Sequence, residues 1–449
     1  MKHTNEYYRR RTENLKYANQ IIKGCLKKVY IHNYIPGQVI YNLGEYPNKM
    51  SIMPTEYDYR LIKKLSENGV GLIQIHEEWN DSLRIMGADK YTSHDKNGLK
   101  EFIKLCHSFD IKVLPYVSSG FFDVRDPDYT DRFIRSDAKL YMNYYRYRMC
   151  SAASPEWNKY LFDNIRRMLD EYEFDGIFND MGYDMCDDEG NKYKPGEYDP
   201  FIEDMLIRLY DLVKNEYGGI VKLHQGEIMV PVSENKIYDY LWVGENCETS
   251  EELIKTVNCS PYVIPCPDYK TSKEKNYDIY FSRALPFLQF LLRADGRPIT
   301  GERVCAPGIE YLEDIESGHF RKIREYYLKH QNGPWVYSEW SDIPDDELMR
   351  KKWFEYLRLY KPMVTENSCC FIDINKDNGL TAEPVDNDVH MSMFVNEDCY
   401  VCISNLGTES RKVVFKQIWT DRVTKKAGSM INIPPGGMIF LKKQRGDTK

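Results

Sequence analysis

Long apolar runs are missing from this sequence. No stretch of its 449 residues approaches the roughly 18 consecutive apolar residues of a membrane-spanning helix, and residues 1–11 lack the apolar centre of a secretion signal. Strong basic clusters are missing too: 61 Lys and Arg stand against 69 Asp and Glu, the net charge is -8, and both signs are interspersed. We therefore predict a soluble cytoplasmic protein that binds neither membranes nor nucleic acid.

Motifs for common cofactors are also missing. No predicted strand is followed by the G-x-G-x-x-G of a dinucleotide site, and the acidic run 184–189 lacks the D-x-D-x-D-G spacing of a calcium loop. Cys399 and Cys402 have C-x-x-C spacing, but no second ligand pair accompanies them. We predict no cofactor and no metal. The 12 cysteines are scattered irregularly, which suits a reducing compartment.

Aromatic side chains, in contrast, are abundant. The chain contains 36 tyrosines and 7 tryptophans, and aromatic residues make up 14% of it. Such side chains stack and hydrogen-bond at once, as sugar-binding clefts require, although a tyrosine-rich core has the same composition. The composition is therefore compatible with a carbohydrate ligand but does not require one.

Apolar strand-like runs alternate with helical segments along most of the chain, and polar residues follow many of the runs. Eight such units predict an α/β fold, a (β/α)8 TIM barrel with its active site at the carboxyl ends of the strands. A doubly wound open sheet is the alternative, which the missing phosphate-binding loop disfavours. The predicted strands are 28–34, 70–76, 112–117, 176–178, 220–224, 238–243, 262–265 and 298–300, and the predicted helices are 56–68, 96–109, 155–173, 200–217, 250–256 and 277–293.

Short alternating strands replace this pattern after a helix at 346–360. They are predicted at 370–374, 389–395, 399–404, 412–419, 429–433 and 438–442, with turn residues between them. This spacing predicts a small all-β antiparallel sandwich. We therefore predict three parts: a helical lead-in at 1–27, a catalytic barrel at 28–362 and the sandwich at 363–449.

Asp180 stands at the end of the fourth predicted strand. The apolar run 176–178 is followed directly by Asn179 and Asp180. A buried parallel strand delivers a polar side chain to a site in this way, but an aspartate after a strand also commonly caps the next turn. Taken alone, the stretch supports both interpretations.

Three stretches together resemble the (β/α)8-barrel glycoside hydrolases, in particular the α-galactosidase and α-amylase-like groups. Residues 98–116 have the form G-x-K-x-h-h-x-x-x-H-x-x-x-I-K-V-h-x-Y, where h is an apolar residue. Residues 172–180 look like the fourth strand of these enzymes, which a carboxylate closes, and residues 399–441 look like the β-sandwich that follows their barrel. The resemblance covers roughly residues 60–445.

The resemblance implies a glycoside hydrolase in which Asp180 is the nucleophile. Such enzymes usually use one ionised and one protonated carboxyl group, because the transition state is a cation and the leaving oxygen takes a proton. The α-galactosidase pattern points to Glu245 as acid/base, and the α-amylase pattern points to Glu227. The chain departs from both: Phe178 stands where amylases have Arg, and no Asp occupies the strand-six position. We favour Glu245, because the apolar neighbour Trp242 favours the protonated form.

Polar and aromatic residues near the predicted strand ends are candidate sugar ligands. For each of them a solvated loop or a place in the core is the alternative. The candidates are His76, Glu78, Trp79, Tyr116, Asn179, Asp184, His224, Trp242, Asn246, Asp268 and Arg303.

The sequence thus predicts a retaining glycosidase acting on a carbohydrate. Asp180 attacks the anomeric carbon, and Glu245 first protonates the departing oxygen and then activates water. A transglycosidase would use the same intermediate. A decayed barrel that binds carbohydrate without turnover is the rival from another class of protein.

Overall fold

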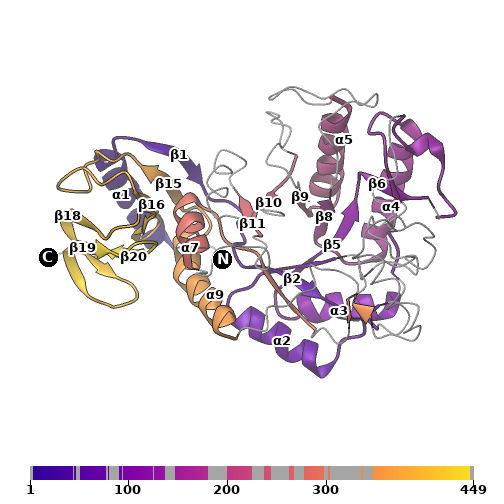
Figure 1. Cartoon of the computed structure of the whole chain (residues 1–449), viewed down its shortest axis with the longest axis horizontal. Coiled ribbons are helices and arrows are strands. Elements are labelled where there is room, and N and C mark those ends of the chain that lie inside the picture. Colours follow the sequence, from indigo (N-terminus) through magenta and orange to yellow (C-terminus); the bar gives the residue numbers. More distant parts are fainter. Residues whose placement is uncertain are drawn as a thin grey trace. The chain divides into compact units, whose positions relative to one another are not determined.

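The structure is a computed structural model. It describes residues 4–43, 45–46, 51–76, 79, 91–93, 95–124, 126–136, 147–180, 200–224, 237–243, 262–266, 278–297, 302–303, 335–336 and 347–444. Contacts divide the chain into two compact units: a barrel unit of residues 37–243 and 292–345, and a second unit of residues 1–36, 244–291 and 346–449. Figure 1 shows the elements of both.

A parallel sheet forms the centre of the barrel unit (Figure 1). Its strands follow the order β10-β9-β8-β5-β4-β2-β12, and each neighbouring pair is parallel. Nearly all of their side chains are buried, as expected for a sheet that is covered on both faces. The strands are β2 (Gln38–Asn42), β4 (Leu72–Ile75), β5 (Lys112–Ser118), β8 (Gly176–Asp180), β9 (Ile220–His224), β10 (Tyr240–Val243) and β12 (Arg293–Gly296).

The sheet is curled with the stagger of a barrel. The Lys222 ammonium on β9 donates a hydrogen bond to the Gln38 amide oxygen on β2 (3.0 Å), although three strands lie between β9 and β2 in the sheet. The strand pairings align Gln38 with Leu72 and Lys112, and across β8 with Gly218 just before β9. Lys222, which contacts Gln38, lies four residues after Gly218, and four strand pairs separate β2 from β9. A stagger of about one residue per strand pair is that of the tilted strands of a (β/α)8 barrel.

Three helices of the barrel unit begin at side-chain caps that the sequence encodes. Thr55 and Asp58 form a reciprocal capping box at α2, Asp95 caps α3, and Ser154 caps α4 just before Pro155. The four predicted helices from 56 to 217 are confirmed, with ends that shift by a few residues. They are α2 (Glu56–Glu67), α3 (Lys96–His107), α4 (Pro155–Glu171) and α5 (Pro200–Asp211), which continues as a π-helical turn at Leu212–Glu216.

The first predicted barrel strand is wrong. Residues 28–34 do not enter the parallel sheet; instead β1 (Cys25–Tyr30) pairs antiparallel with β15 (Cys369–Ile374) in the second unit. The side chains of β1 alternate between exposed and more buried positions, whereas those of β2 are all buried. A parallel barrel strand has helices or side chains on both faces and therefore has the second pattern.

The last predicted barrel strand lies too late in the chain. β12 begins at Arg293, the last residue of the predicted helix 277–293. The predicted strand 298–300 lies outside the described residues. That helix stops early: α7 (Asp278–Ala284) runs into a 3-10 turn that ends at Leu288, where the backbone is left-handed with φ of 59°. The predicted helix 250–256 also lies outside the described residues.

A seven-stranded antiparallel sheet forms most of the second unit, with the strand order β1-β15-β16-β17-β20-β18-β19. The predicted strands are confirmed to within a few residues. Helix α1 (Asn5–Ile21) contributes Ala18 to an apolar core that also holds Val401, Phe415 and Trp419. The other strands of the sheet are β16 (Val389–Val395), β17 (Cys399–Asn405), β18 (Arg411–Asp421), β19 (Ala427–Ile433) and β20 (Met438–Lys443); the unit also contains β11 (Val263–Pro265) and α9 (Glu347–Tyr360).

In the described part of the chain, no helix has both the length and the apolar character needed to cross a membrane.

Several short strands complete the described part of the chain. The short strands form a pair and a three-stranded sheet in the barrel unit: β6 (Phe121–Asp123) with β7 (Tyr147–Met149), and β3 (Glu45–Tyr46) with β13 (Glu302–Arg303) and β14 (Trp335–Val336).

A buried ion pair fixes the segment that follows β2. The Arg297 guanidinium donates to both carboxylate oxygens of the fully buried Asp58, at 3.0 Å each, and to the backbone oxygens of Leu43 and Met53. Burial opposes the ionisation of Asp58. Hydrogen bonds from Arg297 and Tyr41 outweigh it, and the pKa of this carboxyl lies below its ordinary value.

We expect Arg297→Met to lower the free energy of unfolding by about 3 kcal/mol at pH 7, because it leaves the buried Asp58 without its cation. Urea unfolding measures this loss. The folded-state pKa of Asp58 is depressed, so the pair contributes stability above the unfolded pKa, and the difference from wild type shrinks as the pH falls. Arg60→Met, which breaks an exposed pair with Glu56, is the control and should cost less than about 1 kcal/mol. Equal losses in both variants contradict the prediction.

Candidate active site

Asp180 is the last residue of β8 and stands at the carboxyl end of the parallel sheet. In the registers it aligns with Ser118 on β5 and with His224 on β9. Side chains alternate along a strand, so Phe178 and Asp180 share the face of β8 that Lys222 and His224 share on β9. Because Lys222 reaches across to Gln38, this face is the barrel interior.

Two donors from the flanking strands hold the Asp180 carboxylate. The Tyr116 hydroxyl on β5 donates to Oδ2 (2.8 Å), and Nδ1 of His224 on β9 lies 3.1 Å from Oδ1. A carboxylate only accepts hydrogen bonds, so Nδ1 of His224 carries the hydrogen in this contact. Each carboxylate oxygen therefore has one donor, which fixes the plane of the carboxylate.

Aromatic rings and a second histidine surround this carboxylate group. The ring of Trp242 on β10 lies 4.0 Å from that of His224 and 5.1 Å from that of Phe178, centroid to centroid. The ring of His76, just after β4, lies 5.6 Å from Phe178 and 6.1 Å from Trp242. Nε2 of His76 lies 2.8 Å from the amide nitrogen of Gln74. Side chains from β4, β8, β9 and β10 thus pack together around and beneath the carboxylate.

The electrostatic environment favours the ionised form of Asp180. Burial opposes ionisation, but the charge interaction with His224 and the hydrogen bonds from His224 and Tyr116 outweigh it, and nearby His76 adds to them. The pKa of Asp180 therefore lies below its ordinary value. Its side chain is still 24% exposed, against 6% for His224, so the carboxylate is the group that an incoming molecule can reach.

We expect Tyr116→Phe to raise the pKa of Asp180, because one of the donors that stabilise its charge is lost. Activity then falls at a higher pH on the acidic side of the profile of kcat/KM, by about half a pH unit to one unit. Tyr210→Phe is a matched control, since that hydroxyl also donates to an aspartate, Asp239, away from the site. If the acidic side of the kcat/KM profile of Tyr116→Phe lies at the same pH as in wild type, the role given to this hydroxyl is contradicted.

The structure brings five of the sequence-predicted residues together: Asp180, Tyr116, His76, His224 and Trp242. Others lie outside the described residues, so their places stay predictions; they are Glu78, Asp184, Glu227, Glu245, Asn246 and Asp268. Arg303 follows β12 in the chain and belongs to β13, which pairs in parallel with β14; its role at the site stays a prediction.

Trp79 and Asn179 are placed in the core, away from the Asp180 carboxylate. Trp79 is fully buried, and its indole N–H donates to the backbone oxygen of Tyr116 (2.9 Å), so it offers no ring face to a sugar. Asn179 alternates to the outer face of β8 and is fully buried as well. Neither of its side-chain amide atoms has a hydrogen-bond partner among the described residues. Trp79 therefore supports β5 rather than lining the site, and the Asn179 side chain lies on the opposite face of β8 from Asp180.

Three interior polar residues beneath the site, Gln38, Gln74 and Lys222, were missed by the sequence analysis, although His76 and His224 beside them were predicted. Gln74 and His76 on one strand, and Lys222 and His224 on another, stand two positions apart in apolar surroundings, and Gln38 faces them. The signal that could have found them is this period of two, which puts both members of each pair on one face. The contacts across the barrel could not have been found, because they join residues far apart in the sequence.

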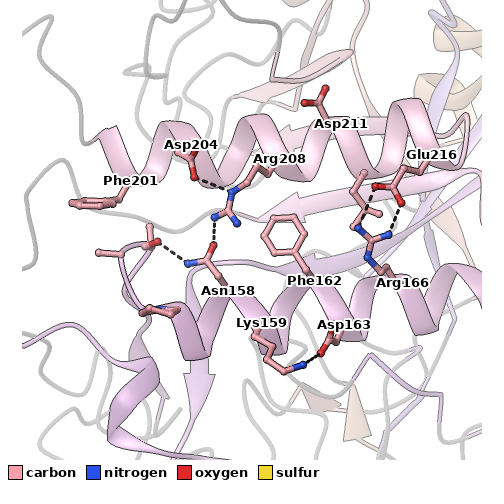
Figure 2. Close-up of a pocket in the computed structure, with 14 residues that line it drawn as sticks. Asn158, Lys159, Phe162, Asp163, Arg166, Phe201, Asp204, Arg208, Asp211 and Glu216 are labelled. Carbon is pink, nitrogen blue, oxygen red and sulfur yellow. Dashed lines mark hydrogen bonds and ion pairs between the residues drawn. The ribbon is translucent and has the colours of Figure 1, made fainter.

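Among the described residues, no group of three His, Cys, Asp or Glu could hold a metal ion. A cavity of about 850 Å³ lies between α4 and α5 (Figure 2). Its charged side chains pair with neighbours: Arg166 with Glu216, and Arg208 with Asp204. None of the residues gathered around Asp180 lines this cavity.

The chain matches no protein-family model and no curated protein sequence. Solved structures with a similar fold do exist. A noncanonic maltogenic α-amylase from Thermotoga neapolitana has a TM-score of 0.56 at 11% identity, covering 91% of this chain and 99% of that one. An α-amylase from Geobacillus thermoleovorans complexed with acarbose has 0.56 at 9% identity, covering 91% and 98%. A family GH13_31 enzyme has 0.57 at 11% identity, covering 92% and 100%.

These likenesses concern the fold. They agree with the curled parallel sheet and the antiparallel β-domain, and so with the predicted combination of a (β/α)8 barrel and a carboxyl-terminal β-domain. The structural neighbours are amylase-like, in line with one of the two groups that the sequence resembles. Identities of 9–11% leave the chemistry to be argued from the site itself.

Proposed function

We propose that this protein is a glycoside hydrolase with Asp180 as the nucleophile of a retaining mechanism. The observation that carries the proposal is a partly exposed carboxylate at the carboxyl end of the fourth barrel strand, held ionised by Tyr116 and His224. Active sites of (β/α)8 barrels lie at this edge. The similar fold of the α-amylases supports the proposal, and one of them was solved in complex with acarbose, a carbohydrate.

The chemistry follows from the charge of the transition state. Cleavage of a glycosidic bond develops positive charge at the anomeric carbon, which an anion on one face of the sugar stabilises. Asp180 has its carboxylate plane fixed by one donor on each oxygen, so little reorganisation is needed for attack. The nucleophile forms the covalent glycosyl ester, and water then cleaves that ester.

In a different role for the same pair, His224 would be a general base and Asp180 would orient its ring, as in the catalytic triads of hydrolases. The exposures of the two side chains disfavour it. His224 is only 6% exposed and packs on Trp242, whereas Asp180 is 24% exposed. The member of the pair that faces incoming molecules is the carboxylate, which suits a nucleophile and leaves His224 as its orienting donor.

The acid/base of the proposed mechanism is Glu245, with Glu227 as the alternative. Described strands lead toward both: β10 ends at Val243, two residues before Glu245, and β9 ends at His224, three residues before Glu227. Both strands end at the same edge of the sheet as β8. Either glutamate follows a strand at the edge that presents Asp180.

The finer features of the function are proposed with it. The substrate is a carbohydrate, and the protein works in the cytoplasm without a cofactor. A transglycosidase, which moves the sugar from the same covalent ester to an acceptor other than water, is the second candidate, since the Asp180 geometry serves both equally well.

A screen of aryl α- and β-glycosides tests the proposal, with the product anomer followed by NMR. We expect turnover of at least one aryl glycoside with retention of configuration. Sugar binding without turnover on any of them contradicts the proposal and favours a carbohydrate-binding barrel. Turnover with inversion rejects Asp180 as a nucleophile.

A further inference from the structure

Trp242 is the third member of a row of register partners that begins at Asp180. Asp180 on β8 aligns with His224 on β9, and His224 aligns with Trp242 on β10. Register partners in a parallel sheet point to the same face, so all three side chains lie on the barrel-interior face that Lys222 marks. The strands thus place a carboxylate, an imidazole and an indole at one level of the barrel.

The indole of Trp242 packs closely on the imidazole of His224. The two ring centroids lie 4.0 Å apart, and the ring planes are inclined by 38°. On its other contacts, the indole lies 5.1 Å from the ring of Phe178, centroid to centroid, and Trp242 is only 2% exposed. Its ring is therefore held inside the barrel against His224, and almost none of its surface is open to a substrate.

This ring contact matters because the hydrogen bond to Asp180 does not by itself orient the imidazole. Nδ1 of His224 lies 3.1 Å from Oδ1 of Asp180, and that contact restrains one atom of the ring. A ring that is held at one atom can still turn, and a hydrogen bond weakens as its angle departs from linear. An indole packed on the imidazole blocks such turning, because protein interiors are close-packed. Trp242 thus restrains the plane of the ring that binds Asp180.

The same contact has an electrostatic consequence. The face of an indole attracts a cation that lies within about 6 Å of its centre, so Trp242 favours the protonated form of His224. A protonated imidazole binds a carboxylate more strongly than a neutral one does. The other titratable groups that surround this pair on the described strands are Tyr116 on β5, His76 after β4 and Lys222 on β9.

We propose that Trp242 is a positioning residue, whose indole holds the His224 imidazole in the orientation that keeps Asp180 ready for attack. It touches no substrate and acts through His224. This inference deepens the proposed function and rests on it for the role of Asp180 as the nucleophile. The link from Trp242 through His224 to Asp180 is measurable without any substrate.

The experiment follows the titration of Asp180 by NMR in protein labelled with ¹³C at the aspartate side-chain carboxyls, where the signal missing from Asp180→Asn identifies Asp180. In Trp242→Leu we expect the midpoint to rise by about half a pH unit to one unit, because a misoriented imidazole stabilises the carboxylate less. Trp242→Phe retains a ring and should give a smaller rise. Trp353→Leu removes a fully buried tryptophan that packs on Phe290 and Phe354, and should leave the midpoint unchanged.

A double-mutant cycle tests whether the effect passes through His224. In His224→Gln the imidazole on which Trp242 packs is gone. Adding Trp242→Leu or Trp242→Phe to this variant should therefore leave the Asp180 midpoint where His224→Gln puts it. A shift as large in the His224→Gln background as in the wild type overturns the proposal, because Trp242 then acts on Asp180 without His224.

The phenylalanine variant keeps the proposal testable if Trp242→Leu does not fold. If the Asp180 midpoint is unchanged in Trp242→Leu, or in Trp242→Phe where the leucine variant does not fold, Trp242 only fills the core and the proposal is overturned. Where a glycoside is turned over, the acidic side of the kcat/KM profile moves to higher pH by the same amount as the midpoint. If the midpoint shifts but the wild type cleaves no glycoside, it is the glycosidase assignment that fails.

Discussion

Asp180→Asn is expected to lower kcat on an activated aryl glycoside by about 10⁴-fold or more. The amide has nearly the shape of the carboxylate, but it carries no charge and cannot form the glycosyl ester. Losses of this order are typical when a covalent nucleophile is removed. Because Tyr116 and His224 remain in place, the barrel should fold, which near-ultraviolet circular dichroism and the melting temperature can verify.

The control for this loss lies at the other end of the same strand. Asp175 precedes β8 and is bound by His107 (2.8 Å), by Lys112 (2.9 Å) and by the backbone N–H of Val113 (2.8 Å). Asp175→Asn removes an aspartate from the amino end of the strand, where barrels carry stabilising rather than catalytic residues. We expect a lower melting temperature and a kcat within about twofold of wild type. An activity loss comparable to that of Asp180→Asn contradicts the assignment.

Glu245→Gln is expected to lower kcat by about 10²–10⁴-fold on a glycoside with a poor leaving group, and far less on one with a good leaving group. A poor leaving group needs a proton from the acid, whereas a good one departs without it. The comparison of phenyl and dinitrophenyl glycosides of the same sugar measures this difference directly.

Glu227→Gln is the matched variant, because it makes the same change after the neighbouring strand. If Glu245 is the acid/base, Glu227→Gln keeps the wild-type dependence on the leaving group. The reverse result assigns the role to Glu227. Wild-type behaviour of both variants excludes the two glutamates and contradicts the two-carboxylate scheme proposed for this chain.

The sequence predicted the strands around Asp180 and the antiparallel β-domain because local patterns specify both. The run 176–178 is apolar and ends at once on polar residues, as a buried strand with an exposed end does. Strands of the β-domain alternate with a period of two and are separated by turn residues, so their limits were close to those observed.

The ends of the barrel could not be predicted from local patterns. Residues 28–34 are as strand-like as β2, and only the partner strand β15, more than 330 residues further on, draws β1 into the antiparallel sheet. The residues between α7 and β12 are apolar except for Gln289 and contain no Gly or acidic residue, so the sequence does not mark where β12 starts. Both choices depend on tertiary pairing, which propensity and periodicity do not contain.

The candidate site was predicted in part. Asp180, Tyr116, His76, His224 and Trp242 lie at or near the carboxyl ends of strands, and the parallel topology brings such positions together. Gln38 and Lys222 were missed because they lie within strands, where a polar residue indicates neither a loop nor a site until its partner across the barrel is known. Trp79 was a candidate sugar ligand with a solvated loop or a place in the core as the alternative, and its indole donates to the backbone of β5.

The most direct test of the central claim is to trap the glycosyl-enzyme. The protein is treated with a fluorinated glycosyl fluoride of whichever sugar the aryl glycoside screen identifies, which slows hydrolysis of the ester more than its formation. Peptide mass spectrometry then locates the added sugar. We predict one sugar per chain on the peptide that contains Asp180, and none in Asp180→Asn. A label on another carboxylate, or fluoride release with inversion and no label, contradicts the account.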